Sequence, residues 1–186
     1  MPAPAVLREV FLAYRARRGE EDDGFLFEDA GGPLTRLDVL VYRSAELTTF
    51  ATIGMAAREM PATPGPGGGG RAELHYVRRA RLTRAEEHAI AVRLANLAIH
   101  PFLTGTPVDW GHMVGLGDDF PVLPGCRAVF LAGPLSPDAV DYVHTREGPV
   151  RILNVVPITD AERDLGRGMS PLDFARYLLD KRDLYT

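Results

Sequence analysis

The feature that most constrains the fold is the stretch at residues 151–163, RILNVVPITDAER. Its first half is apolar and mostly β-branched, which favours a well-buried, central strand: Ile152, Leu153, Val155 and Val156. Pro157 cannot donate a hydrogen bond to a neighbouring strand, so the strand is predicted to end there. We expect the sheet to be built beside this strand.

A helix is predicted to begin directly after this strand. Thr159 and Glu162 have the spacing of a capping box, in which each side chain accepts a hydrogen bond from the backbone N–H of the other residue. Asp160 and Glu162 also place negative charge at the positive end of the helix dipole. A second capping box is predicted at Thr83 and Glu86.

Hydrophobic periodicity predicts the remaining elements. Helices are expected over residues 3–18, from Thr83 to about His100 with Pro101 as the stop, and from Ser170 onward. Strands are expected over residues 25–27, 37–42, 47–55, 71–77, 110–116, 127–132 and 141–146. Residues 58–70 contain three prolines and five glycines, and we expect a mobile Pro/Gly loop there. Strand signals continue on both sides of this loop, so one domain is predicted over residues 1–186.

Composition narrows the class of protein. Hydrophobic residues make up 46% and charged residues 25%, as in soluble globular proteins. A formal net charge of -4 argues against nucleic-acid binding and against a surface for anionic lipid. Cys126 is the only cysteine, so an intrachain disulfide is impossible and a reducing compartment is favoured. With no apolar run of membrane-spanning length, a cytoplasmic location is predicted.

The motifs of common enzyme sites are not found. The histidines are dispersed, and none lies in an HExxH motif: His75, His88, His100, His112 and His144. Cys126 has no recognisable base beside it, and a buried structural thiol is favoured. Asp109, Asp118 and Asp119 lack the spacing of a calcium loop. No catalytic residue, metal ligand or cofactor is therefore assigned.

One row of polar residues is a stronger candidate for a functional surface. Along residues 71–77, Arg71, Glu73 and His75 alternate with apolar residues and share one face of the predicted strand. We expect that face to be half-exposed. It is either a solvated row with cross-strand ion pairs or a recognition surface.

In order along the chain, several segments resemble the suppressor-of-fused domain family. They are FATIGM at 50–55, RAELHYV at 71–77, the Ala-rich helix with His100-Pro101, WGHMV at 110–114, AVFLAGP at 128–134 and ILNVVPITDAER at 152–163. The resemblance runs from about Leu37 to Leu179, and its most specific parts are RAEL and NVVPITDAER.

This resemblance implies an α+β domain with a central mixed, largely antiparallel β-sheet and packed helices. It also implies a binding protein without catalysis. Bacterial single-domain members are proposed to be immunity proteins that neutralise toxins, and the animal namesake holds a peptide of a transcription factor. This chain is much shorter than the two-lobed animal proteins, so a peptide cleft between two lobes is not implied. The expected partner is a protein, with a toxin as one form of it, and the expected cofactor is none.

Three functions are left open by the sequence. The first is a non-catalytic partner-binding domain, whose candidate contact residues are Arg71, Glu73, His75, Asp109, Trp110 and His112. The second is a metal-dependent or hydrolytic enzyme that would use Asp109, His112, Asp118 and Glu73, and it requires these side chains to converge. The third is a regulatory module that accepts a peptide on a sheet edge.

Overall fold

The computed structural model describes residues 3–62 and 69–186, and its sheet is built around β8 (Gly148–Ile158). One side of β8 runs parallel to β4 (Arg71–Arg78). Its other side pairs antiparallel with β7 (Tyr142–Thr145) and further along with β6 (Ala128–Ala132). The expectation that the sheet forms beside this strand is confirmed.

The remaining strands extend the sheet on both sides of β8. The order is β1-β2-β3-β4-β8-β6-β5, with β1 (Asp23–Glu28), β2 (Arg36–Arg43), β3 (Thr48–Ile53) and β5 (Met113–Gly115). Within this described sheet every neighbouring pair except β4–β8 is antiparallel. The sheet is mixed and largely antiparallel, so the predicted α+β class is confirmed.

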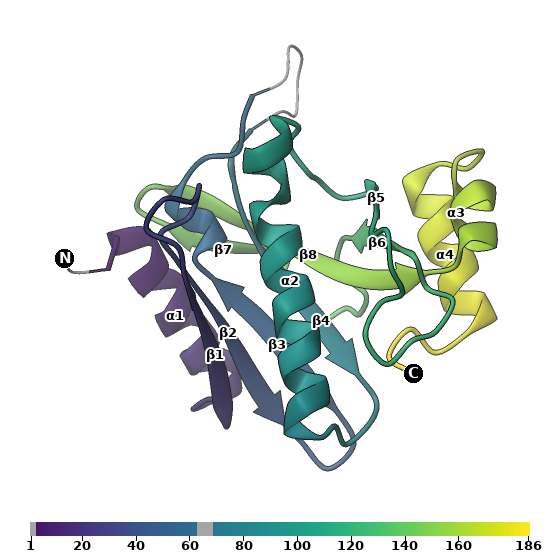
Figure 1. The fold of residues 1–186 in the computed structure, drawn as a ribbon, viewed down its shortest axis with the longest axis horizontal. Helices are drawn as coiled ribbons and strands as arrows, with labels where there is room; N and C mark the ends of the chain where they lie inside the picture. Colours follow the sequence, from purple (N-terminus) through teal and green to yellow (C-terminus); the bar gives the residue numbers. More distant parts are fainter. Residues whose placement is uncertain (1–2, 63–68) are drawn as a thin grey trace.

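Helices cover both faces of the sheet (Figure 1). The long α2 (Arg84–Thr104) lies across one face, where Leu153 and Val155 of β8 pack in the same apolar cluster as its buried side. On the opposite face, Ile152 packs in the cluster of α1 (Ala5–Arg18) and Val156 in that of α4 (Pro171–Lys181). A strand buried on both faces explains the unbroken apolar composition of β8.

Helix starts follow their local sequence signals closely. Both predicted capping boxes form, Thr83 with Glu86 at α2 and Thr159 with Glu162 at α3 (Asp160–Gly166). Ser170 caps α4 by accepting from the backbone N–H of Asp173 at 3.1 Å. Capping depends on residues only three positions apart, so these helix starts can be predicted without knowledge of tertiary contacts.

The predicted stop at Pro157 is wrong, because β8 continues through it to Ile158. Pro157 lies opposite Val129 of β6, and its carbonyl accepts from Nη2 of Arg182 at 2.7 Å. The nitrogen and carbonyl of one strand residue point to the same side, so the nitrogen of Pro157 also faces away from β6. The missing N–H therefore removes no ladder hydrogen bond at this position.

Two other boundaries differ from the prediction. α2 continues past the buried Pro101 to Thr104, because the proline lies only one turn from the helix end, where Gly105 forms a left-handed cap. The strand expected over residues 110–116 is reduced to β5, since a turn with a positive φ at Gly111 occupies its start.

Residues 63–68 of the predicted mobile loop lie outside the described residues. Met60, which lies before this gap, is buried, and its backbone N–H donates to the carbonyl of Gly70 at 2.9 Å.

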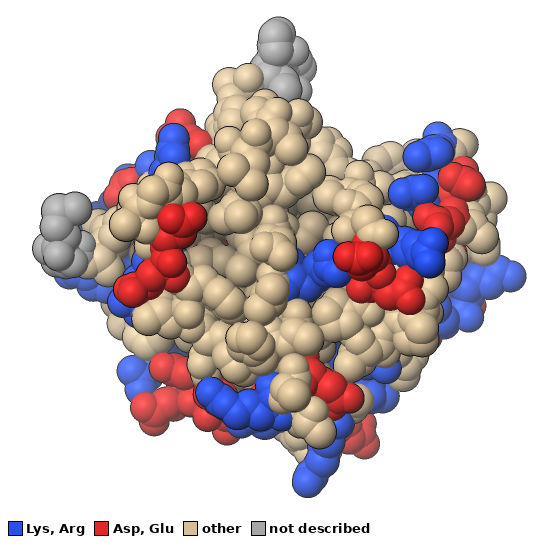
Figure 2. Space-filling model, in the orientation of Figure 1, with Lys and Arg blue, Asp and Glu red and all other residues tan. Residues whose placement is uncertain are grey.

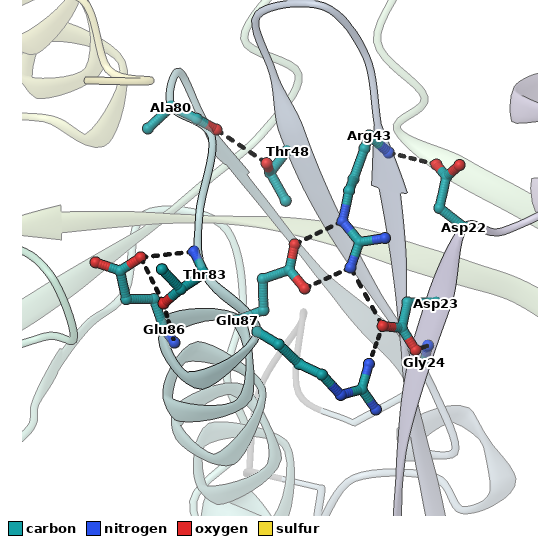
Figure 3. Close-up of polar contacts among 10 residues, drawn as sticks. Asp22, Asp23, Gly24, Arg43, Thr48, Ala80, Thr83, Glu86 and Glu87 are labelled. Atoms are coloured by element: carbon teal, nitrogen blue, oxygen red, sulfur yellow. Dashed lines mark hydrogen bonds and ion pairs between the residues drawn. The ribbon is translucent and has the colours of Figure 1, made fainter.

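A half-buried ion pair joins the start of α2 to the sheet (Figure 3). Both guanidinium nitrogens of Arg43 that face Glu87 donate to its carboxylate, at 2.7 and 2.6 Å. Arg43 also reaches Asp23 of β1 at 3.2 Å, and Arg84 contacts the same aspartate. This group joins α2, β1 and β2 through charge rather than apolar packing.

Figure 2 shows mostly uncharged side chains over the upper and middle parts of α2, with acidic and basic side chains mixed around the margins of this face. In the described residues, no helix is both long and apolar enough to cross a membrane. Cys126 is buried as expected, and burial raises the pKa of its thiol.

Candidate functional site

The expectation of a half-exposed charged row on β4 is wrong. Glu73 and His75 are both buried, and most of the Arg71 side chain is covered. The physical reason is α1, which packs over this face so that the Tyr14 ring lies 5.0 Å from the His75 ring. A strand pattern of alternating polar and apolar residues cannot show that a distant helix covers the polar side.

Glu73 organises the turn after β3. Its carboxylate accepts from the hydroxyl of Thr52 at 2.6 Å and from the backbone N–H groups of Gly54 and Ala56 at 2.8 and 3.0 Å. Gly54 has a φ of 147°, and a Cβ there would stand 2.6 Å from the Arg36 carbonyl oxygen. The turn therefore requires glycine, and it presents its amides to the carboxylate.

Burial sets the protonation of this row. Desolvation raises the pKa of Glu73 to about 7, although the hydrogen bonds from Thr52 and the turn amides oppose that change. Desolvation, with the nearby charges of Arg18 and Arg17, lowers the pKa of His75 to about 3. His75 is therefore neutral at physiological pH and lies in the positive field of the last turn of α1.

Arg71, at the start of β4, points toward a cleft at the edge of the molecule. Its Nη1 donates to the Ala56 carbonyl at 2.8 Å, which joins it to the turn that Glu73 holds. Its Nη2 donates to Glu147, in the turn between β7 and β8, at 2.9 Å. The Arg71 side chain is 15% exposed and that of Glu147 is 41% exposed, so the arginine is fixed and its partner is free to move.

The other sequence candidates lie in one segment, residues 109–112, which contacts Arg151 of β8. Its Nη1 lies 2.7 Å from Asp109, an ion pair whose angle does not suit a hydrogen bond. Its guanidinium carbon lies 5.8 Å from the ring centre of Trp110. The backbone N–H of Asp109 donates to Nδ1 of His112 at 3.2 Å. The segment at residues 109–112 therefore positions Arg151, which sequence reasoning did not select.

Arg71 and Arg151 line a common hollow of about 350 Å³, which we call the arginine cleft. Its lining also includes Tyr142, His144, Glu147 and Glu59. Arg151 is 17% exposed, so both guanidinium groups are held at the cleft wall by protein contacts. One signal could have identified Arg151, because a basic residue inside a strand as apolar as β8 requires a fixed partner.

Two of the four side chains that the enzyme hypothesis named, Glu73 and Asp109, have other partners in the described residues. Both carboxylate oxygens of Glu73 are occupied by the β3 turn, and Asp109 pairs with Arg151. Across residues 3–62 and 69–186, no group of three or more histidine, cysteine or acidic side chains is arranged to hold a metal ion. The convergence required by the enzyme hypothesis is absent from that part of the chain.

The family model of Suppressor of fused protein (SUFU) matches residues 34–184, which is most of the chain. The chain belongs to the suppressor-of-fused family. The resemblance identified from the sequence is thereby confirmed. Among curated proteins, no sequence matches.

Solved suppressor-of-fused structures share the fold at low sequence identity. A homologue from Neisseria gonorrhoeae FA 1090 is 16% identical, with a TM-score of 0.73, over 96% of this chain and 92% of that one. The protein of a Sufu–Fu complex is 12% identical, with a TM-score of 0.67, over 99% and 86%. Drosophila Suppressor of Fused is 13% identical, with a TM-score of 0.66, over 97% of this chain but 46% of its own length. At these identities the likeness establishes the fold alone.

Proposed function

We propose that this chain is a non-catalytic protein-binding domain and that its arginine cleft contacts the partner. The observation that carries the proposal is the pair of arginines, Arg71 and Arg151, fixed at the wall of an open cleft beside aromatic side chains. Arginine and aromatic residues supply much of the energy at protein interfaces. Because protein contacts already hold both guanidinium groups, binding would sacrifice little of their conformational entropy.

The family supports a protein partner rather than a substrate. One similar structure is that of Sufu in complex with Fu, a suppressor-of-fused protein bound to another protein. The sequence candidates Asp109, Trp110 and His112 support the same function indirectly, since they position Arg151. Glu73 supports it through the turn that binds Arg71. In this proposal neither Glu73 nor His75 touches the partner, because both are buried.

A finer form of the proposal concerns the kind of partner. The resemblance to bacterial single-domain members leads us to propose a toxin as the partner and neutralisation in the cytoplasm as the outcome. The single cysteine is compatible with a reducing compartment. The finer form requires that the partner be toxic when produced alone and harmless when this chain is produced with it.

Affinity capture from the native host, followed by binding measurements with the purified partner, tests the proposal. Arg71→Gln and Arg151→Gln should each weaken binding about ten-fold or more, as expected for central interface arginines. Co-expression of the partner with the wild-type chain or with either variant would then measure neutralisation by cell survival.

Arg167→Gln combined with Arg176→Gln is the matched control. Both of these arginines are well exposed, and they lie near the C-terminal helices, away from the cleft lining. The control should bind like the wild type. Full binding by a folded protein that carries both Arg71→Gln and Arg151→Gln would contradict the proposed site. Failure of the captured partner to harm cells would remove only the toxin form.

A further inference from the structure

A second hollow lies beside β7. It measures about 410 Å³ and lies between the C-terminal half of α1 and β7. Its polar lining consists of Tyr14, Arg17, Arg18, His75, Tyr142 and His144. Within the described residues this lining includes no carboxylate, so the hollow, which we call the α1 hollow, is positively charged.

The two hollows share part of their walls. Tyr142 and His144 line both the arginine cleft and the α1 hollow. Their rings lie stacked at 6.3 Å along β7. The hollows therefore adjoin across one aromatic ridge, with Arg71 and Arg151 at one end and Arg17 and Arg18 at the other. We call the surface from Arg17 and Arg18, past these two rings, to Arg71 and Arg151 the track. The arginine cleft also holds the carboxylates of Glu59 and Glu147, whereas the lining of the α1 hollow holds none.

An internal carboxylate already occupies one end of this track. Glu147 lies in the tight turn between β7 and β8 and accepts from Nη2 of Arg71 at 2.9 Å. The same turn is joined to α1, since the backbone N–H of Arg146 donates to Glu9 at 2.9 Å. Because Glu147 is 41% exposed, an external carboxylate can replace it on Arg71 without unfolding the turn.

We propose that the track accepts an extended acidic segment of the partner, with carboxylates at both ends and apolar residues over the Tyr142–His144 ridge. Glu147 then acts as an internal competitor that keeps Arg71 satisfied until the partner arrives. This inference rests on the proposed protein-binding function and adds the chemistry of the partner. It also gives the exposed Arg17 and Arg18 a role, although neither lies in the arginine cleft.

Synthetic peptides test the inference directly. The main probe has a run of glutamates at each end of a short neutral centre with one aromatic residue, and both of its termini are capped. Two further peptides keep only one of the acidic runs, and a fourth replaces every glutamate by glutamine. A fifth peptide has no acidic side chain but a free C-terminus, which distinguishes a terminal carboxylate from side-chain carboxylates. Binding is measured by calorimetry at low and high salt.

The two-ended peptide should bind about ten-fold or more tighter than either one-ended peptide, because the second end binds intramolecularly. Arg17→Gln combined with Arg18→Gln should reduce that affinity about ten-fold, to the level of a one-ended peptide. Glu147→Gln should raise it about two- to five-fold, the range expected for losing an exposed competing ion pair. Arg167→Gln with Arg176→Gln should change nothing, and melting curves check the fold of each variant.

Equal binding of the glutamate and glutamine peptides would overturn the inference. So would an unchanged affinity in the Arg17/Arg18 variant, or a Glu147→Gln protein that binds no tighter than the wild type. Binding of the free-terminus peptide alone would replace the acidic segment by a C-terminal carboxylate and overturn the two-ended form. If acidic peptides fail while the natural partner still requires Arg71 and Arg151, this inference fails and the proposed function stands.

Discussion

Replacing Arg43 by methionine should destabilise the protein through the carboxylate that it leaves behind. Glu87 is 1% exposed, and Arg43 donates two hydrogen bonds to it at 2.7 and 2.6 Å. Methionine keeps the length of the side chain but supplies no donor. Glu87 would then be a buried charge without its guanidinium partner.

The magnitude follows from the burial of the two partners. Breaking a fully buried ion pair on one side costs about 3–5 kcal/mol. Arg43 is 39% exposed, so water can reach the position that its guanidinium vacates, and the expected loss falls to about 2–3 kcal/mol. That is a large part of the ~5–15 kcal/mol that stabilises an ordinary domain.

Urea denaturation of four proteins separates charge from packing: the wild type, Arg43→Met, Glu87→Leu and the double variant. The double variant should recover at least half of the loss seen in Arg43→Met, because no unpaired charge remains buried. Arg84→Gln is the control, since that exposed arginine contacts Asp23 and not Glu87, and its stability should stay within about 0.5 kcal/mol. A loss below about 1 kcal/mol in Arg43→Met, or losses that simply add in the double variant, would refute the reasoning.

Three further predictions follow from features of the fold. Thr159→Ala should lower the free energy of unfolding by about 1 kcal/mol at an unchanged m-value, because the cap of α3 is lost; an unchanged midpoint would count against the cap. Burial raises the pKa of Glu73 from 4.5 to about 7, so the unfolded chain releases this proton first and stability should fall by roughly 3 kcal/mol as pH rises across that interval. Glu73→Gln should remove that fall, and a Gln variant with the same pH profile of melting temperature would show that another group causes it. Val156→Asp should prevent soluble folding, since it buries a carboxylate beside Phe174 in the α4 cluster; a soluble protein with wild-type melting would contradict a central β8.

The features that could be predicted from the sequence are those that depend on residues close together in the chain. The capping boxes of α2 and α3 rest on residues three positions apart, and the buried strand β8 is visible in its own composition. The two proline errors have different causes. The missing N–H of Pro157 faces away from β6 and removes no ladder hydrogen bond. Pro101 removes one hydrogen bond of α2, but only one turn of helix follows it.

The candidate site was less predictable because it depends on tertiary contacts. Burial of Glu73 and His75 is caused by α1, which lies more than fifty positions earlier in the chain. Arg71 was selected as a candidate contact and lies at the cleft, yet Arg151 was not selected, since the two lie on paired strands far apart in sequence. Asp109, Trp110 and His112 were selected as contacts, and in the structure Asp109 and Trp110 contact Arg151. A partner-binding role for these residues remains a prediction.

The placement of α1 has a practical consequence for defining the smallest fragment that folds. The family match begins at residue 34, whereas α1 (Ala5–Arg18) and β1 (Asp23–Glu28) precede it. A truncation made at the family boundary would uncover the Tyr14 contact on His75 and leave β2 as a bare sheet edge. Expression fragments of this protein should therefore begin before Ala5, because the homology boundary and the physical boundary are about thirty residues apart.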